Sequence, residues 1–165
     1  MPAPSPSSPS PARPTRWVTR ERPKIDRIAC PWLLRRFVDP DAEIVFVPAD
    51  RVLAAAEALA AEPFDIPGVA FSHDGEKCSF DAFVERFGLG GDAALQRVAL
   101  IVRGADTGRP ELAPECAGLL AVSLGVSAMA GDDDQRALAL GFAVYDALYA
   151  WARDAAGETH GWPPR

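Results

Sequence analysis

The feature that most constrains this chain is the alternation of strand-like and helix-like segments between residues 16 and 72. Short β-rich runs are predicted at 16–19, 43–47 and 68–72, the last after a turn at 63–67. Helices are predicted at 26–38 and after Asp50, and each follows an aspartate suited to N-capping. Strands that alternate with helices favour parallel pairing, so this order predicts a small, largely parallel three-stranded sheet.

The second half of the chain has the spacing of helices. Asp92 is a good N-cap for a segment in which apolar residues recur every three or four positions, although VALIV at 98–102 also suits a buried strand. We predict a helix there. A further helix is expected to end at Leu124 before Gly125, and the DDD run at 132–134 should begin a long helix that reaches about Arg153. The fold class is therefore a helix-rich α/β domain with a helical C-terminal half.

Length and composition set the domain organisation. A chain of 165 residues with 48% hydrophobic content suits one domain, which we place at 16–155. Residues 1–15 are rich in Pro, Ser and Ala and are expected to form a disordered tail, and 156–165 a flexible C-terminal tail. The N-terminus lacks the apolar region of a signal peptide. The sequence contains no run of 18 apolar residues, so no membrane span is predicted.

Charge and cysteine usage narrow the function classes. Residues 1–40 hold eight Lys/Arg against three Asp/Glu, whereas residues 41–165 hold nine against twenty. An acidic body repels phosphate backbones, so we expect no direct nucleic acid binding by this chain alone. Three scattered cysteines argue against a disulfide scaffold and favour a cytoplasmic location.

The densest chemistry lies in FSHDGEKCSFDAFVERFGL, residues 71–89. His73 should end a strand, and Ser79 should N-cap a helix whose phenylalanines face the core. Cys78, Asp81 and Glu85 then share the opposite face, within plausible reach of His73. Thiol, imidazole and carboxylate suit a transition metal or a proton-transfer site. The alternative is a solvated acidic face, because HxxxxC is a weak pattern.

Two other segments have candidate polar groups. In the first helix, Arg35 and Arg36 flank Trp32, which suits either a solvated surface or an oxyanion cradle. In RGADTGRPE, residues 103–111, Asp106 should lie in a loop that feeds a helix N-terminus. Such a loop suits an anion or a carboxylate ligand, and the alternative is an aspartate that bonds turn amides. Cys30 and Cys116 lie in apolar stripes and are expected in the core.

Three pieces, IDRIACPWLLRRF, FSHDGEKCSF and IVRGADT, together resemble the C-terminal domain of the chromate resistance protein ChrB family, from about Arg16 to Trp151. Longer members are similar to chromate-responsive regulators, so the resemblance implies a sensing or accessory domain for chromate resistance. Metal-ligand candidates are His73, Cys78, Asp106 and Asp26. Oxyanion-binding candidates are Arg27, Arg35, Arg36, Trp32 and Arg103, and secondary candidates are Asp81 and Glu85.

Two functions remain open from the sequence. One is a module that binds chromate, a sulfate-like oxyanion or a transition-metal ion of unspecified identity. The other is a small cytosolic metal-dependent or redox enzyme acting on chromate or related oxidants. Either could work with a separate regulatory domain or as a homo-oligomer. We expect His73, Cys78 and Asp106 to meet in one cleft, with Asp26, Arg27 and Arg35 along the same wall.

Overall fold

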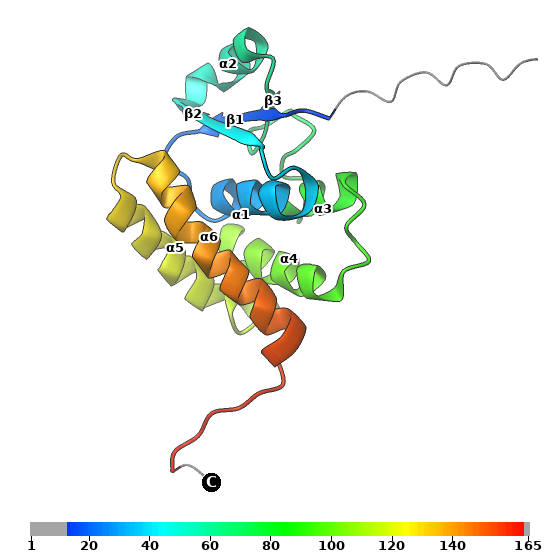
Figure 1. Ribbon diagram of the computed structural model, residues 1–165, viewed down its shortest axis with the longest axis vertical. Helices are drawn as coiled ribbons and strands as arrows, with labels where there is room; N and C mark the ends of the chain where they lie inside the picture. Colours follow the sequence, from blue (N-terminus) through cyan, green and yellow to red (C-terminus); the bar gives the residue numbers. More distant parts are fainter. Residues whose placement is uncertain (1–12, 164–165) are drawn as a thin grey trace, which may run out of the picture.

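The computed structural model describes residues 13–163 and contains a three-stranded parallel sheet in the order β2-β1-β3 (Figure 1). The central strand β1 (Arg16–Arg20) pairs along its whole length with β2 (Glu43–Val47), and Val18 lies opposite Val45. The short edge strand β3 (Glu62–Pro63) pairs with Trp17 and Val18. The predicted helix-rich α/β fold with a parallel sheet is thus confirmed.

The third strand lies earlier in the chain than predicted. Residues 68–72 are not a strand: Phe71 makes only an isolated bridge to Phe64, and Pro63 belongs to β3 rather than to a turn. The turn follows instead at Asp65 and Gly68, which both adopt positive φ angles of 53° and 83°. Proline is tolerated at this sheet edge because it has no N–H to leave unpaired.

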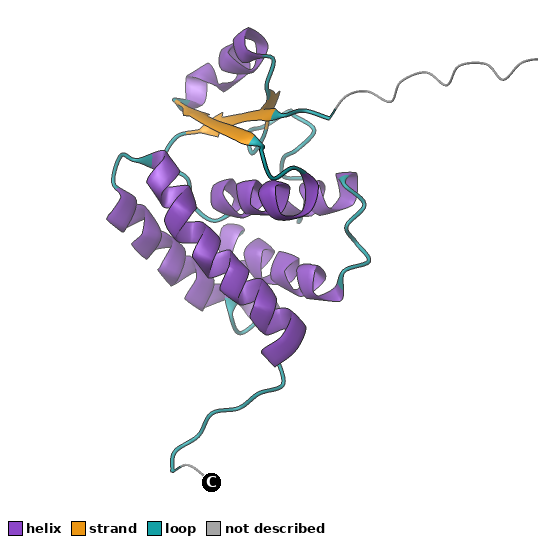
Figure 2. Ribbon diagram, in the orientation of Figure 1, coloured by secondary structure: helices purple, strands orange, loops and turns teal. Residues whose placement is uncertain are grey.

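The helices form layers on both sides of the sheet (Figures 1 and 2). Helix α2 (Val52–Leu59) covers one face, where Val18 and Val52 belong to a small apolar cluster. Helices α1 (Asp26–Leu33) and α3 (Ser79–Arg86) cover the other face, and Trp17 points into that larger core. Successive residues of β1, Trp17 and Val18, therefore face opposite sides of the sheet, as the two-residue period of a strand requires.

Three short helical turns lie beside or between the longer helices and strands. A π-helical turn, Leu34–Val38, continues α1 up to the predicted stop before Asp39-Pro40. Turns of 3₁₀ helix precede α2 at Ala49–Arg51 and occupy Pro110–Leu112. These turns keep the helical segments compact between the longer elements.

The C-terminal half is helical, as expected. Helix α4 (Ala93–Asp106) confirms the helical prediction for VALIV, and the Asp92 carboxylate accepts a hydrogen bond from Leu95 N–H (2.9 Å). Helix α5 (Cys116–Ala130) passes through Gly125, so the predicted end at Leu124 is wrong. The chain leaves α5 at Gly131, whose φ of 61° suits glycine. Asp133 caps α6 (Asp134–Ala150), and a π-helical turn, Trp151–Ala155, follows.

The large core joins the sheet to α1, α3, α4 and α6. Trp32 is one of the largest fully buried side chains of this core, and its ring packs against Phe80 and Tyr145. Cys30 and Cys116 are buried and free, as predicted. None of the described helices is both long and apolar enough to cross a bilayer. Most of the predicted N-terminal tail lies outside the described residues.

Candidate functional site

The site is centred on His73, whose side chain is 43% exposed. Its Nε2 atom lies 3.0 Å from Asp106 Oδ2, 3.3 Å from Asp26 Oδ2 and 3.4 Å from Asp65 Oδ1. Three carboxylates from three distant segments thus converge on one imidazole nitrogen. The chain between β3 and α3 is irregular, so His73 follows the isolated bridge at Phe71 rather than a full strand.

Asp26 reaches the site from the first turn of α1 and is fully buried. The sequence suggested an N-cap for its own helix, but its carboxylate caps α3 instead. Ser79 N–H donates to Oδ2 (2.8 Å), and Phe80 N–H donates to Oδ1 (3.3 Å). Burial is the main cause that raises the pKa of Asp26, while the His73 hydrogen bond opposes the shift. The two N–H donors hold the carboxylate in a fixed orientation.

Asp65 belongs to the cluster, although the sequence analysis did not single it out. It is buried, and its Oδ1 accepts a hydrogen bond from Ser79 Oγ (2.7 Å). Its Oδ2 pairs with Arg20 (2.8 Å) and faces Arg27 Nε at 3.4 Å. Hydrogen bonds from His73 and Ser79, with the charge of Arg20, outweigh burial and lower the pKa of Asp65. The sequence signal was an acid in a Pro-bounded turn, which also suits an ordinary surface turn.

Asp106 is the last residue of α4, not part of a loop as predicted. Gly104 lies within α4 and does not break the helix. Glycine is needed at this position because a Cβ would overlap the backbone of Arg109 and the side chain of Cys116. Burial, followed by the charges of Asp26 and Asp65, raises the pKa of Asp106 to about 7. Hydrogen bonds to Asp26 and Asp65 raise the pKa of His73 to about 10.

Three of these side chains have the arrangement of metal ligands. Asp26, His73 and Asp106 each offer a ligand atom, and these atoms lie within 4.8 Å of one another. Asp65 is compensated by Arg20 and Arg27, so it is better placed to orient His73 than to bind a cation itself. Burial and the charge of Arg20 lower the pKa of Arg27, whose Nη1 also donates to the Arg20 and Glu21 carbonyls.

Cys78, a predicted ligand, is not one of the three side chains whose ligand atoms converge. It is fully buried, and it N-caps α3 in a capping box with Asp81. Burial raises the pKa of its thiol well above the ordinary value. Asp81 is buried too. Arg103 compensates its charge by donating hydrogen bonds to both carboxylate oxygens (2.7 and 2.9 Å). Glu85, by contrast, is exposed and pairs with Lys77.

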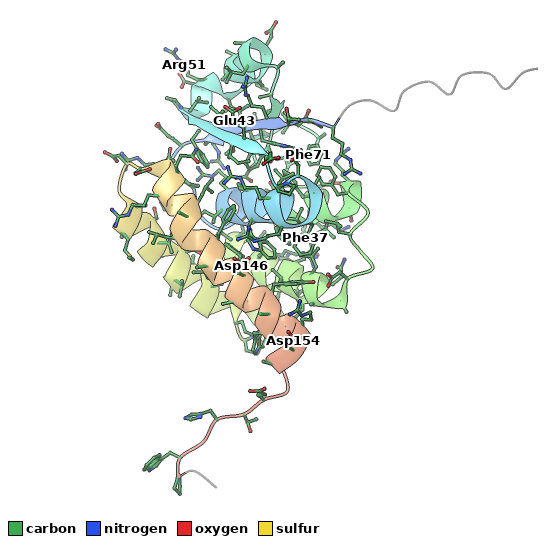
Figure 3. All side chains as sticks on the ribbon, viewed as in Figure 1. Phe37, Glu43, Arg51, Phe71, Asp146 and Asp154 are labelled. Carbon is green, nitrogen blue, oxygen red and sulfur yellow. The ribbon has the colours of Figure 1, made fainter. Side chains whose placement is uncertain are left out.

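The remaining oxyanion candidates lie at the end of α1 and in the π-helical turn that follows it, against α6. Asp146 accepts hydrogen bonds from Trp32 Nε1 (2.8 Å) and from two nitrogens of Arg36 (2.8 and 2.9 Å), where α6 crosses α1 (Figure 3). Arg35 Nε donates to the Ala42 carbonyl (3.0 Å). The hydrogen bonds of these three side chains thus go to Asp146 and Ala42, not to the residues around His73.

A cavity of about 780 Å³ opens beside the cluster. Its lining comes from the β3–α3 connection, from the start of α2 and from the end of β1: Arg20, Ala49, Asp50, Leu53, Asp65, Ile66, Pro67, Gly68, Ser72 and His73. The Nε atom of Arg20 is buried and has no hydrogen-bond partner among the described residues. The cluster is therefore accessible from one side to a small molecule.

Comparison with known proteins agrees with the motifs. The family model for the ChrB C-terminal domain matches residues 17–152. Protein ChrB of Cupriavidus metallidurans is 35% identical over 133 residues, which are 81% of this chain and 39% of that protein. The chain thus corresponds to well under half the length of this relative. No solved structure matches it. On these grounds the chain belongs to the ChrB family, as a C-terminal domain.

Proposed function

We propose that this chain contributes to chromate resistance by binding a divalent transition-metal ion through Asp26, His73 and Asp106. Membership of the ChrB family supports the role in chromate resistance. The observation that supports the metal is the convergence of three ligand atoms within 4.8 Å. This chain matches only 39% of the longer relative, so the activities of that whole protein are not transferred to this chain except as a proposal.

The charge balance favours a cation over a directly bound oxyanion. Arg20 and Arg27 compensate Asp65, which leaves the buried Asp26 carboxylate, the half-buried Asp106 carboxylate and one imidazole around the same point. Nitrogen and carboxylate ligands without a thiolate suit Mn²⁺, Fe²⁺, Co²⁺, Ni²⁺ or Zn²⁺, whereas Cu⁺ prefers sulfur. Because Asp26 is held by two backbone N–H groups, one ligand is already oriented before the ion binds.

Three protein ligands leave coordination positions that an exogenous molecule can fill. The cavity beside His73 has room for a small oxyanion such as chromate or sulfate, and the unpartnered Nε of Arg20 is a donor at its wall. In this proposal the oxyanion reaches the metal from the cavity. Trp32, Arg35 and Arg36 take no part, because they are bonded to other parts of the fold.

The metal is tested by elemental analysis of protein purified without a metal-binding tag, followed by calorimetric titration of the metal-free protein with MnCl₂ and ZnCl₂. One ion should bind per chain. His73→Ala and Asp106→Asn should abolish binding, whereas Asp50→Ala, which removes an exposed acid at the rim of the same cavity, should leave it unchanged. Failure to bind any of these ions, or equal binding by all variants, would exclude the proposal.

The same cavity also favours a second candidate, a metal-dependent enzyme that acts on chromate or a related oxidant. The two functions differ in turnover. A sensing module binds chromate stoichiometrically and leaves it unchanged. Loss of chromate by the metal-loaded protein in the presence of NADH, beyond that with the metal salt alone and absent in His73→Ala, would favour the enzyme.

A further inference from the structure

Helix α5 has an exposed face without any polar side chain. Every exposed position between Ala117 and Met129 is glycine, alanine, valine, leucine or methionine. The large members are well exposed: Val122 by 47%, Leu124 by 49% and Met129 by 61%. In a chain with net charge −6, an uncharged helix face of this length is an apolar patch of the kind that marks an interaction site.

The outer face of α5 has the shape of a trough between two ridges. At 100° per residue, Ala121, Gly125 and Ala128 lie opposite the buried stripe of the helix and form the trough. Val122 with Met129 forms one ridge, and Leu120 with Leu124 forms the other. Small residues between larger ones let a second helix approach closely and pack its ridge into the groove.

Two glycines in α5 have no role in the packing of the single chain. A Cβ placed on Gly118 or Gly125 would meet nothing within 4 Å, in contrast to Gly141 on α6, where it would clash with Ile28. Glycine weakens a helix interior relative to alanine. Its presence at two open positions of one face therefore indicates that another backbone approaches there.

Helix α6 extends this face. An apolar groove of about 430 Å³ runs between the two helices, with Gly118 and Val122 on one side and Val144, Ala147 and Leu148 on the other. Ala139 and Ala143 continue the exposed apolar surface along α6. The helices lie side by side as an antiparallel pair (Figure 1), so the patch is two helices wide.

From this face we infer that two copies of the chain dimerise through α5 and α6 as a four-helix bundle. A helix of 15 residues is about 22 Å long, and two helices with axes about 9 Å apart are together about 18 Å wide, which gives a footprint of about 400 Å². A standard interface buries about 800 Å² per partner, of which roughly 60% is apolar. The patch is thus close to the apolar part of a stable dimer interface, with polar residues at its rim.

A second copy fits the face better than an unrelated partner. An uncharged patch offers no charge pattern that a different protein would complement, whereas a two-fold axis places each ridge beside the trough of the other copy.

Sedimentation over a range of protein concentrations tests the dimer. The wild-type chain should sediment at twice its mass of 17.6 kDa. Leu124→Glu and Gly125→Leu should each raise the dissociation constant about tenfold or more, because they bury a charge or fill the trough. Leu53→Glu is the matched control: Leu53 is 61% exposed on α2, and this variant should remain dimeric.

A disulfide test locates the contact independently. The native cysteines are all buried, so Ala121→Cys adds one exposed thiol at the centre of the trough. Mild oxidation should convert this variant to a disulfide-linked dimer, whereas a Leu53→Cys control, with an exposed thiol on α2, should form no disulfide-linked dimer under the same conditions. A monomeric wild-type chain, or a dimer that survives both Leu124→Glu and Gly125→Leu, would overturn the inference, as would preferential capture of another protein by this face.

Discussion

The carboxylate of Asp26, at the start of α1, accepts a hydrogen bond of 2.8 Å from the backbone N–H of Ser79, at the start of α3. The same oxygen, Oδ2, lies 3.3 Å from His73 Nε2. One buried acid therefore joins two helices and also faces the centre of the site. This double role links the stability of the fold to the geometry of the proposed metal ligands.

Asp26→Ala should destabilise the protein as well as abolish metal binding. The substitution leaves two buried N–H groups of α3 without an acceptor, which should lower the free energy of unfolding by about 2 kcal/mol. Asp50→Ala removes an exposed acid that accepts no hydrogen bond from a buried N–H group in the described part of the chain, and this variant should keep nearly the full stability. Urea denaturation of both metal-free variants measures the difference, and equal stabilities would contradict the capping role of Asp26.

The stability of the metal-free protein should fall as the pH rises from about 6.5 to about 10. The folded state raises the pKa of His73 from 6.5 to about 10, so the unfolded chain releases this proton first. The stabilisation is complete below pH 6.5 and is lost as the pH passes the folded pKa. His73→Gln should flatten this part of the profile. Denaturant midpoints across the pH range provide the measurement, and identical profiles for the two proteins would refute it.

Arg103→Leu should destabilise the protein by about 3 kcal/mol, because it leaves the buried Asp81 carboxylate without its bidentate partner. Arg153→Leu is the matched control, since Arg153 pairs with Asp154 at the exposed end of the chain and should change stability by less than about 1 kcal/mol. Thermal and urea unfolding compare the two. A cost for Arg103→Leu as small as for the control would show that the Arg103–Asp81 pair is not a structural contact.

Gly141→Ala should destabilise the contact between α1 and α6 by about 1–3 kcal/mol, because its Cβ would overlap the side chain of Ile28. A helix interior that had space would instead gain stability from alanine. The double variant Gly141→Ala, Ile28→Ala removes the Ile28 Cγ2 methyl group that the new Cβ would overlap, so it should cost less than the sum of the two single variants. An unchanged or raised melting temperature in the single variant would argue against this close approach.

Local patterns in the sequence were sufficient for most of the fold. The parallel sheet, the helix capped by Asp92 and the helix that begins at the DDD run of residues 132–134 follow from residues that are near one another in the chain. The third strand and the end of α5 were misplaced by several residues. Pro63 and Gly125 normally interrupt elements, but a sheet edge tolerates the proline, and a helix tolerates a single glycine at a cost of about 1 kcal/mol relative to alanine.

The motifs also named Asp26, His73 and Asp106, but only the tertiary structure decided which other groups accompany them. Spacing along α3 placed Cys78 on the polar face, yet the folded chain buries it as a helix cap and brings Asp65 to His73 instead. Arg36 finds its acceptor in Asp146, which is 110 residues away in the sequence. A short-range pattern determines the secondary structure and the orientation of a side chain, whereas the choice among several acids depends on contacts that form only when distant segments pack together.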